Sequence, residues 1–155
     1  MGLPASRERG LTLLELTVAM IILSILAVGI LPLSEVGYWR AREVELRRAL
    51  RTIRDALDEY KALADQGKIA VDPSESGYPP DLESLVEGVP LTDVEGTQKK
   101  FLRRVPRDPM VPSGEWGLRS YADDPDGSVW GGQDVYDVYS TSDREALDGT
   151  RYSSW

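Results

Sequence analysis

The chain of 155 residues contains neither cysteine nor histidine. Without cysteine it cannot form a disulfide or use a thiol nucleophile, and cysteine usage gives no indication of the redox compartment. Without histidine it lacks the most common general base and the most common transition-metal ligand. Both absences argue against the more common kinds of catalytic site.

Basic residues are also in the minority, and the formal net charge is −8. A phosphate backbone is held by clustered lysine and arginine, so we expect no nucleic acid as a partner. Six arginines between Arg40 and Arg54 are the exception, but acidic residues interrupt and follow them. We interpret them as the solvated face of a helix.

Polar residues are scarce between Leu11 and Leu33, where Glu15 is the only strongly polar side chain. At about 1.5 Å of rise per residue, a helix of this length spans roughly the hydrocarbon thickness of a bilayer. The stretch 11–33 therefore predicts a transmembrane helix. Arg7 and Arg9 before it predict that the N-terminus lies in the cytoplasm. Residues 34–155 are then enough for one compact domain.

Glu15 distinguishes two interpretations of this helix. An ionisable residue inside a membrane segment costs on the order of 2–3 kcal/mol or more without a partner, and a plain signal anchor has no use for it. In a bundle of identical chains that began at Leu11, the new amine would lie about one helical turn from Glu15 of a neighbour shifted along the axis. Such a pair would set the axial register, as a buried polar residue does in a coiled coil.

The segment Arg9-Gly10-Leu11-Thr12-Leu13-Leu14-Glu15 resembles the processing site of type IV pilins and of type II secretion pseudopilins. The resemblance implies that residues 1–10 are a leader, that prepilin peptidase cuts between Gly10 and Leu11, and that Leu11 becomes N-methylated. It makes Glu15 the assembly and register residue, and Pro32 falls where the family places a helix-loosening proline. Leu11 replaces the usual phenylalanine.

The middle of the chain predicts that the helix continues beyond the apolar run as an amphipathic helix to about Ala64, with a stop at Gln66-Gly67. Apolar residues recur every three or four positions, at Leu46, Leu50, Ile53, Leu57 and Tyr60. Oppositely charged residues four apart are expected to support the exposed face. These are Glu43 with Arg47, Arg51 with Asp55, and Arg54 with Asp58.

The C-terminal half predicts a short helix and then a small sheet. Residues 76–85 indicate a turn and a helix with proline near its start, and with 101–109 they resemble segments of the major pseudopilins. Residues 116–121 and 135–139 are rich in strand formers and flank a turn at 123–127. We predict an α+β, type IV pilin-like fold: a long N-terminal helix, half transmembrane and half amphipathic, packed against a small C-terminal antiparallel β-sheet.

Six aspartates lie between Asp123 and Asp143 without one basic residue, and crowded carboxylates are typical ligands of Ca²⁺. We interpret those at 123–126 as a hairpin turn. The segment with Ser140, Asp143 and Asp148 resembles the calcium loop of major pseudopilins, which implies a bound Ca²⁺. The loop is shorter than in that family, and an alternative is closure by apolar packing of Leu147, Tyr152 and Trp155.

The resemblance implies a structural subunit, not an enzyme, of a periplasmic pseudopilus that helps to drive type II secretion. It would be a single-pass protein of the bacterial inner membrane with a periplasmic C-terminal domain. Its implied partners are copies of itself, minor pseudopilins, prepilin peptidase, the inner-membrane assembly platform with its ATPase, and membrane lipid before assembly. Two alternatives are a type IV pilin of a surface fibre for adhesion, motility or DNA uptake, and a membrane-tethered enzyme or ligand-binding domain.

Overall fold

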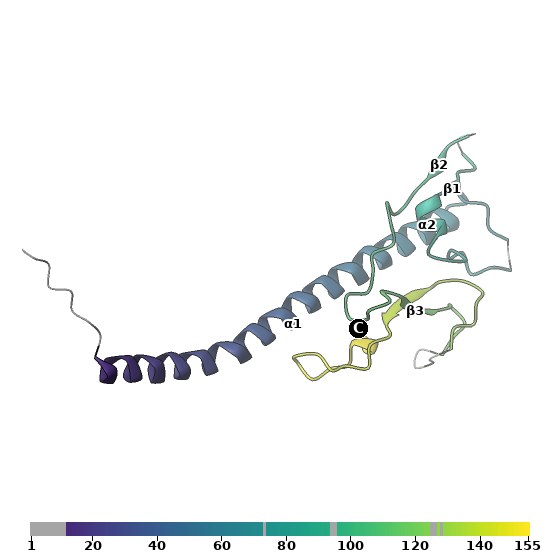
Figure 1. Cartoon of the computed structure of the whole chain (residues 1–155). Helices are drawn as coiled ribbons and strands as arrows, with labels where there is room; N and C mark the ends of the chain where they lie inside the picture. Colours follow the sequence, from purple (N-terminus) through teal and green to yellow (C-terminus); the bar gives the residue numbers. More distant parts are fainter. Residues whose placement is uncertain (1–11, 73, 94–95, 125–126, 128) are drawn as a thin grey trace, which may run out of the picture. The chain divides into compact units, whose positions relative to one another are not determined.

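A computed structural model describes residues 12–72, 74–93, 96–124, 127 and 129–155, without the side chains of residues 28–34. The fold is α+β, as predicted, and consistent with a type IV pilin-like fold. Its elements are α1 (Leu13–Asp65), α2 (Ser84–Glu87), β1 (Val89–Pro90), β2 (Gln98–Lys99), β3 (Trp116–Arg119), β4 (Asp137–Ser140) and the 3₁₀ helix η1 (Tyr152–Ser154) (Figure 1). The chain divides into two compact units, one up to Trp39 and one from Arg40 to Trp155.

Local capping sets both ends of α1. The hydroxyl of Thr12 accepts a hydrogen bond from the backbone N–H of Glu15 at 3.2 Å, which satisfies one of the free donors at the helix start. At the other end Gly67 has a φ of 71°, and the N–H of Lys68 donates to the carbonyl of Leu63 at 2.9 Å. This is the glycine-dependent helix stop expected at Gln66-Gly67. The helix is continuous through Pro32.

The predicted apolar stripe of α1 forms the core of the unit that begins at Arg40. Leu46, Leu50, Ile53, Leu57 and Tyr60 are all buried, because a spacing of three or four residues places them on one face. From the rest of the unit, the side chains of Leu85, Val135, Val138 and Tyr152 are buried as well. The amphipathic prediction for this half of the helix is therefore confirmed.

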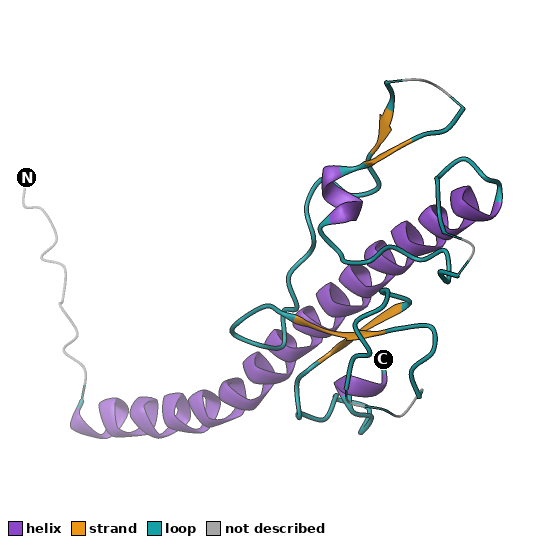
Figure 2. Ribbon diagram, turned by 90° about the vertical axis from the view of Figure 1, so that its right-hand side faces the viewer, coloured by secondary structure: helices purple, strands orange, loops and turns teal. Residues whose placement is uncertain are grey.

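The predicted small sheet is a two-stranded antiparallel pair of β3 with β4 (Figure 2). Gly117 lies opposite Tyr139 in the register. A Cβ at Gly117 would come within 2.3 Å of the Tyr139 ring, so glycine is required for the ring to lie across the neighbouring strand. β4 begins two residues later than predicted, because the N–H of Val135 donates to the carbonyl of Pro79.

A second antiparallel pair, β1 with β2, was not predicted. Each strand has two residues, and the pairs are Val89 with Lys99 and Pro90 with Gln98. Both strands follow α2, which occupies part of the predicted short helix (Figure 2). The carbonyl of Leu85 in α2 accepts hydrogen bonds from the N–H groups of Phe101 and Leu102, both at 2.9 Å. These bonds hold the chain that leaves β2 against the short helix.

Candidate functional site

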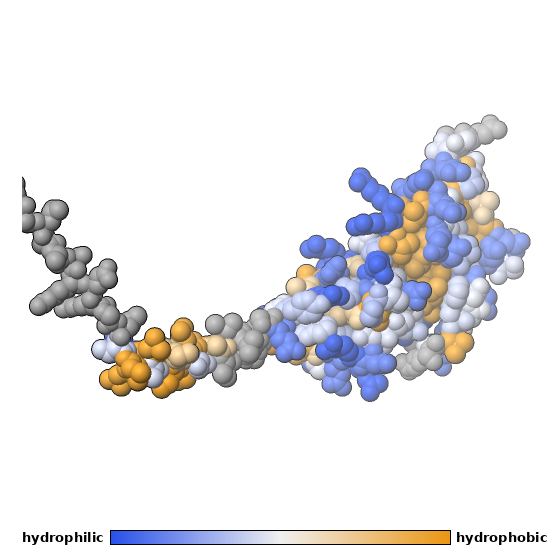
Figure 3. All heavy atoms as spheres, in the orientation of Figure 1, coloured by the Kyte–Doolittle hydropathy of each residue, from blue (hydrophilic) through white to orange (hydrophobic). Residues whose placement is uncertain are grey.

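The first part of α1, residues 13–27, exposes its apolar side chains. Leu13 is 83% exposed and Ile25 is 68% exposed, and the other residues of this stretch are exposed too. Figure 3 shows this stretch in the colours of hydrophobic residues, whereas hydrophilic colours cover much of the unit from Arg40 onward. Burying one such aliphatic side chain gains about 1.5–3 kcal/mol. A surface of this kind indicates a site of contact with lipid or protein.

The polar groups of the same stretch are satisfied within the helix, with one exception. The hydroxyl of Thr17 donates to the carbonyl of Leu14 at 2.8 Å, and the hydroxyl of Ser24 donates to that of Met20 at 2.7 Å. Both bonds remove a polar group from the apolar surface. Within the described residues, the carboxylate of Glu15 has no such partner. It is the one acidic side chain in an apolar surface.

The described residues contain no helix that is both long and apolar enough to cross a membrane. The predicted cleavage and methylation positions, Gly10 and Leu11, lie outside the described residues, as does the side chain of Pro32. The predicted transmembrane segment 11–33 includes these positions and stays a prediction. The register role of Glu15 stays a prediction as well.

The second part of α1 carries a buried carboxylate that sequence reasoning placed on the exposed face. Glu43 is 9% exposed, and its Oε1 accepts hydrogen bonds from the N–H of Leu147 at 2.7 Å and the hydroxyl of Tyr152 at 3.1 Å. Burial and the hydrogen bond to Glu43 both raise the pKa of Tyr152 above its ordinary value. Glu43 therefore fixes the C-terminal loop to the helix. Glu43 lies three residues before Leu46, at the edge of the apolar stripe, and this position was the sequence signal that could have indicated its burial.

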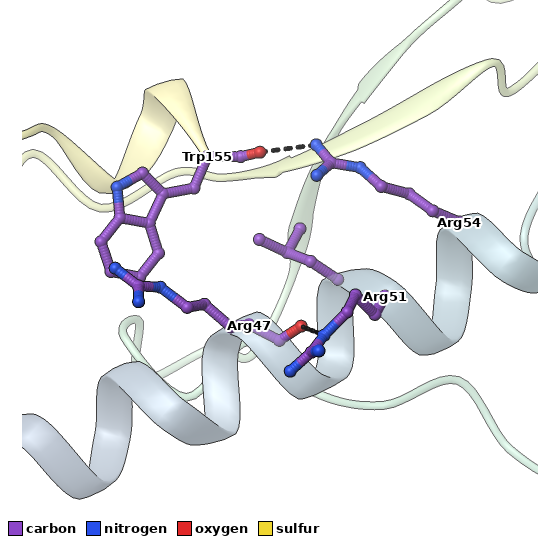
Figure 4. A pocket seen from close by; sticks show the side chains of 5 residues that line it. Arg47, Arg51, Arg54 and Trp155 are labelled. Carbon is purple, nitrogen blue, oxygen red and sulfur yellow. Dashed lines mark hydrogen bonds between the residues drawn. The ribbon is translucent and has the colours of Figure 1, made fainter.

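Two arginines of α1 hold the end of the chain from either side of a cavity of about 470 Å³ (Figure 4). Arg54 donates to both carboxylate oxygens of Asp137, at 2.7 and 3.2 Å, and to the backbone carbonyl of Trp155 at 2.6 Å. The guanidinium of Arg47 lies 4.1 Å from the centre of the Trp155 ring, a cation–π geometry. These contacts close the loop together with the buried ring of Tyr152, which packs edge-on against Trp155. Leu147, expected to share in the packing, is 47% exposed.

Two of the three residues of the predicted calcium loop, Ser140 and Asp148, already have partners within the chain. One carboxylate oxygen of Asp148 accepts from the N–H and hydroxyl of Thr150, at 3.0 and 2.6 Å, and the other lies 3.6 Å from Arg47. The Thr150 hydroxyl above all, with its N–H and the nearby Arg47, lowers the pKa of Asp148. Ser140 is buried and its hydroxyl accepts from the N–H of Ser142, whereas Asp143 is exposed.

The part of the chain that the structure describes brings no three acidic side chains together as metal ligands. The aspartates near residue 123 serve the backbone instead: Asp123 accepts from the N–H groups of Ser120 and Gly131 at 2.8 and 3.0 Å. A calcium ion bound by Ser140, Asp143 and Asp148 stays a prediction that this arrangement does not favour.

The charge pairs expected along the helix face do not form among the described residues. Glu43 is buried, and Arg54 pairs with Asp137 instead of Asp58. Arg51 donates from Nε to the carbonyl of Arg47 and makes no ion pair with Asp55. The interpretation of a solvated face holds for Arg40, Arg48 and Arg51, which are exposed, but not for Arg54.

Comparison with known proteins gives one match, in the N-terminal part of the chain. Residues 5–31 match the family model described as the prokaryotic N-terminal methylation motif. No curated protein and no solved structure matches the chain. The matched segment includes Gly10, Leu11 and Glu15 and covers less than half of the chain. It supports a type IV pilin-like protein that is anchored in a membrane, and it is consistent with prepilin peptidase processing and with a filament of identical copies.

Proposed function

We propose that the chain is a major-pseudopilin-like subunit of a type II secretion system. In this proposal prepilin peptidase removes residues 1–10 and Leu11 is methylated. The subunit then leaves the bacterial inner membrane and adds to a periplasmic filament through the first part of α1. An assembly platform with a cytoplasmic ATPase supplies the force, and minor pseudopilins are further partners. Assembly is the activity, without catalysis by this chain.

The observation that carries the proposal is one carboxylate in an otherwise apolar, exposed helical surface at the capped start of α1. An unpaired charge is costly in lipid, and it becomes favourable when a neighbouring copy supplies a cation. Exposed leucines and isoleucines around Glu15 would be buried by the same neighbours. The surface therefore suits lipid before assembly and other copies after it, and the methylation motif covers this same stretch.

Two features of the sequence favour a secretion pseudopilin over a surface pilin. The segments 76–85 and 101–109 resemble major pseudopilins, and the chain lacks the cysteines with which many pilins close a C-terminal loop. The gene neighbourhood separates the two functions. Genes for a secretin, a secretion ATPase and minor pseudopilins would support export, whereas a gene for a retraction ATPase would support a surface fibre.

Replacement of the carboxylate tests the proposal. We expect Glu15→Val and Glu15→Ala, in cells that carry the processing and assembly machinery, to keep leader cleavage and to lose filaments at least tenfold. The matched control is Glu35→Val, which removes an exposed glutamate of the same helix from outside the matched motif. Cleavage is scored by mobility on gels and filaments by shearing and electron microscopy. Filaments at the normal level in both Glu15 variants would refute the assembly role.

A further inference from the structure

Three arginines on successive turns of α1 line the cavity of about 470 Å³ beside the end of the chain (Figure 4). They are Arg47, Arg51 and Arg54, and the lining is completed by Leu50 and Trp155. None of the described residues that line this cavity is acidic, although the whole chain has a formal net charge of −8. The cavity is therefore a positively charged place in an acidic protein.

The rest of the chain does not neutralise the three guanidinium groups equally. Arg54 makes a bidentate ion pair with Asp137, at 2.7 and 3.2 Å. Arg47 lies 3.6 Å from one oxygen of Asp148, and this pair contributes little because both side chains are more than half exposed. Arg51 makes no ion pair with any of the described residues. At least one positive charge at the cavity is thus left unbalanced within this part of the chain.

Some of the guanidinium N–H groups also lack an acceptor. Arg51 donates to the carbonyl of Arg47 from Nε alone, and its two terminal nitrogens have no hydrogen-bond partner among the described residues. Arg54 makes its four hydrogen bonds through Nε and Nη2, and its Nη1 has no partner in the same part of the chain. These bonds hold the Arg54 guanidinium in place. Such a fixed fork of donors matches the oxygens of an anion.

The spacing of the arginines is unfavourable without an anion. Arg47 and Arg51 are four residues apart, and like charges at this spacing destabilise a helix. All three arginines lie within about 10 Å of helix axis, which is about the distance over which 0.1 M salt screens charges. An anion in the cavity relieves this repulsion and accepts the free N–H groups at the same time.

We infer that this cavity binds a phosphate group through Arg47, Arg51 and Arg54. Its oxygens accept hydrogen bonds from the terminal nitrogens of Arg51 and from Arg54, and Arg47 adds its charge beside the Trp155 ring. A phosphate group suits the three arginines better than a carboxylate, because it offers three strong acceptor oxygens in place of two.

The size of the cavity indicates a phosphate that carries an organic group. Its volume lies within the range of about 300–1,000 Å³ that is typical of small-molecule sites. A free phosphate compound and the headgroup of an anionic lipid both have this chemistry. The inference goes beyond the proposed function and does not depend on it.

Proton–nitrogen NMR of the full-length protein in a neutral detergent tests the site. The probe is inorganic phosphate, compared with sodium chloride at the same ionic strength. We expect the indole N–H signal of Trp155, identified by its loss in Trp155→Phe, to shift with added phosphate and to saturate. The indole signals of Trp116 and Trp130 are internal controls that should stay in place, because neither residue lines the cavity.

Thermal unfolding tests which arginines bind the phosphate. Millimolar inorganic phosphate should raise the Tm of the unaltered chain by about 2 °C or more relative to chloride, and Arg51→Gln should remove this rise. The matched control is Arg48→Gln, which should keep it, because Arg48 is exposed on the same helix and does not line the cavity. Phosphate also stabilises proteins through its exclusion from their surface, but that effect would be equal in all three proteins.

Lipid nanodiscs separate the two sources of the phosphate group. A rise in Tm with phosphatidylglycerol that is absent with phosphatidylcholine alone and absent in Arg51→Gln would identify a lipid headgroup. A rise with inorganic phosphate alone would identify a free phosphate compound, and either result supports the inference. A Trp155 signal that moves with neither probe, or equal Tm rises in the unaltered chain and in Arg51→Gln, would overturn it and leave the proposed function intact.

Discussion

Residues 13–27 and residues 40–65 of α1 have the same backbone conformation and opposite surfaces. The first stretch exposes its leucines and isoleucines and has one acidic side chain, whereas the second buries an apolar stripe and surrounds it with charges. Backbone hydrogen bonds are satisfied in both, so they do not explain the difference. The apolar side chains of the second stretch are covered by the rest of their own chain. Those of the first stretch are proposed to be covered by lipid or by other copies.

The same substitution in the two stretches should give the largest contrast. Ile53→Ala removes a side chain with no exposed surface and is expected to cost about 2–5 kcal/mol of unfolding free energy. Ile22→Ala, at a position that is 53% exposed, should change it by no more than about 0.5 kcal/mol. Thermal and denaturant unfolding of the full-length protein in detergent measures both. Equal losses of unfolding free energy in the two variants would contradict the conclusion that only the second stretch is buried within its own chain.

A smaller effect is expected from the buried carboxylate. Glu43→Ala leaves the N–H of Leu147 and the hydroxyl of Tyr152 without their acceptor and should cost about 1–3 kcal/mol. Glu43→Gln keeps an acceptor oxygen and should cost less. The matched control is Glu45→Ala, two residues away and exposed. If Glu45→Ala lost as much unfolding free energy as Glu43→Ala, the conclusion that Glu43 fixes the C-terminal loop would be wrong.

The two arginine ion pairs, Arg54 with Asp137 of β4 and Arg47 with Asp148 of the C-terminal loop, should differ in strength. A double-mutant cycle of Arg54→Ala with Asp137→Ala is expected to give a coupling of about 1 kcal/mol, because the pair is bidentate and partly buried. The cycle of Arg47→Ala with Asp148→Ala should give nearly none, since both side chains are more than half exposed. The reverse order of the two couplings would show that the loop is held at Asp148.

Acid should remove the small contribution of Asp148. The pKa of this carboxyl is lower in the folded state than its ordinary value of 3.8, mainly through the Thr150 hydroxyl. Its stabilising effect is therefore present above that value and is lost as the pH falls through the folded pKa. The difference in Tm between the unaltered chain and Asp148→Asn should vanish at low pH. A difference that grows on acidification would have the wrong sign.

Calcium should have the smallest effect. Because the carboxylate of Asp148 already contacts Thr150 and Arg47, we expect millimolar Ca²⁺ to leave the Tm of the full-length protein unchanged and to give no heat in calorimetric titration. A chelator should likewise have no effect. A rise in Tm with Ca²⁺ that Asp143→Ala abolishes would restore the calcium loop implied by the family resemblance.

Local patterns were sufficient for the core half of α1 and for the β3–β4 pair. Both signals come from residues that are close together in the sequence. They are the helical spacing from Leu46 to Tyr60 and the strand-forming residues around Trp116 and Val138. The pairing of β1 with β2 was missed, because strands of two residues carry no periodicity.

Charged contacts between distant segments were missed for a different reason. Glu43 reaches Tyr152 across 109 positions and Arg54 reaches Asp137 across 83. Helical spacing suggested nearer partners for both residues, and tertiary contacts replaced those. The calcium loop was implied by the resemblance to major pseudopilins, and a resemblance does not reveal that Thr150 and Arg47 already contact Asp148.

The mass of the N-terminal peptide of the membrane-extracted protein tests the central claim most directly. A processed assembly subunit predicts a peptide that begins at Leu11 and is heavier than the unmodified peptide by one methyl group. An intact N-terminus at Met1, or a cut on the far side of the apolar run, would contradict the account.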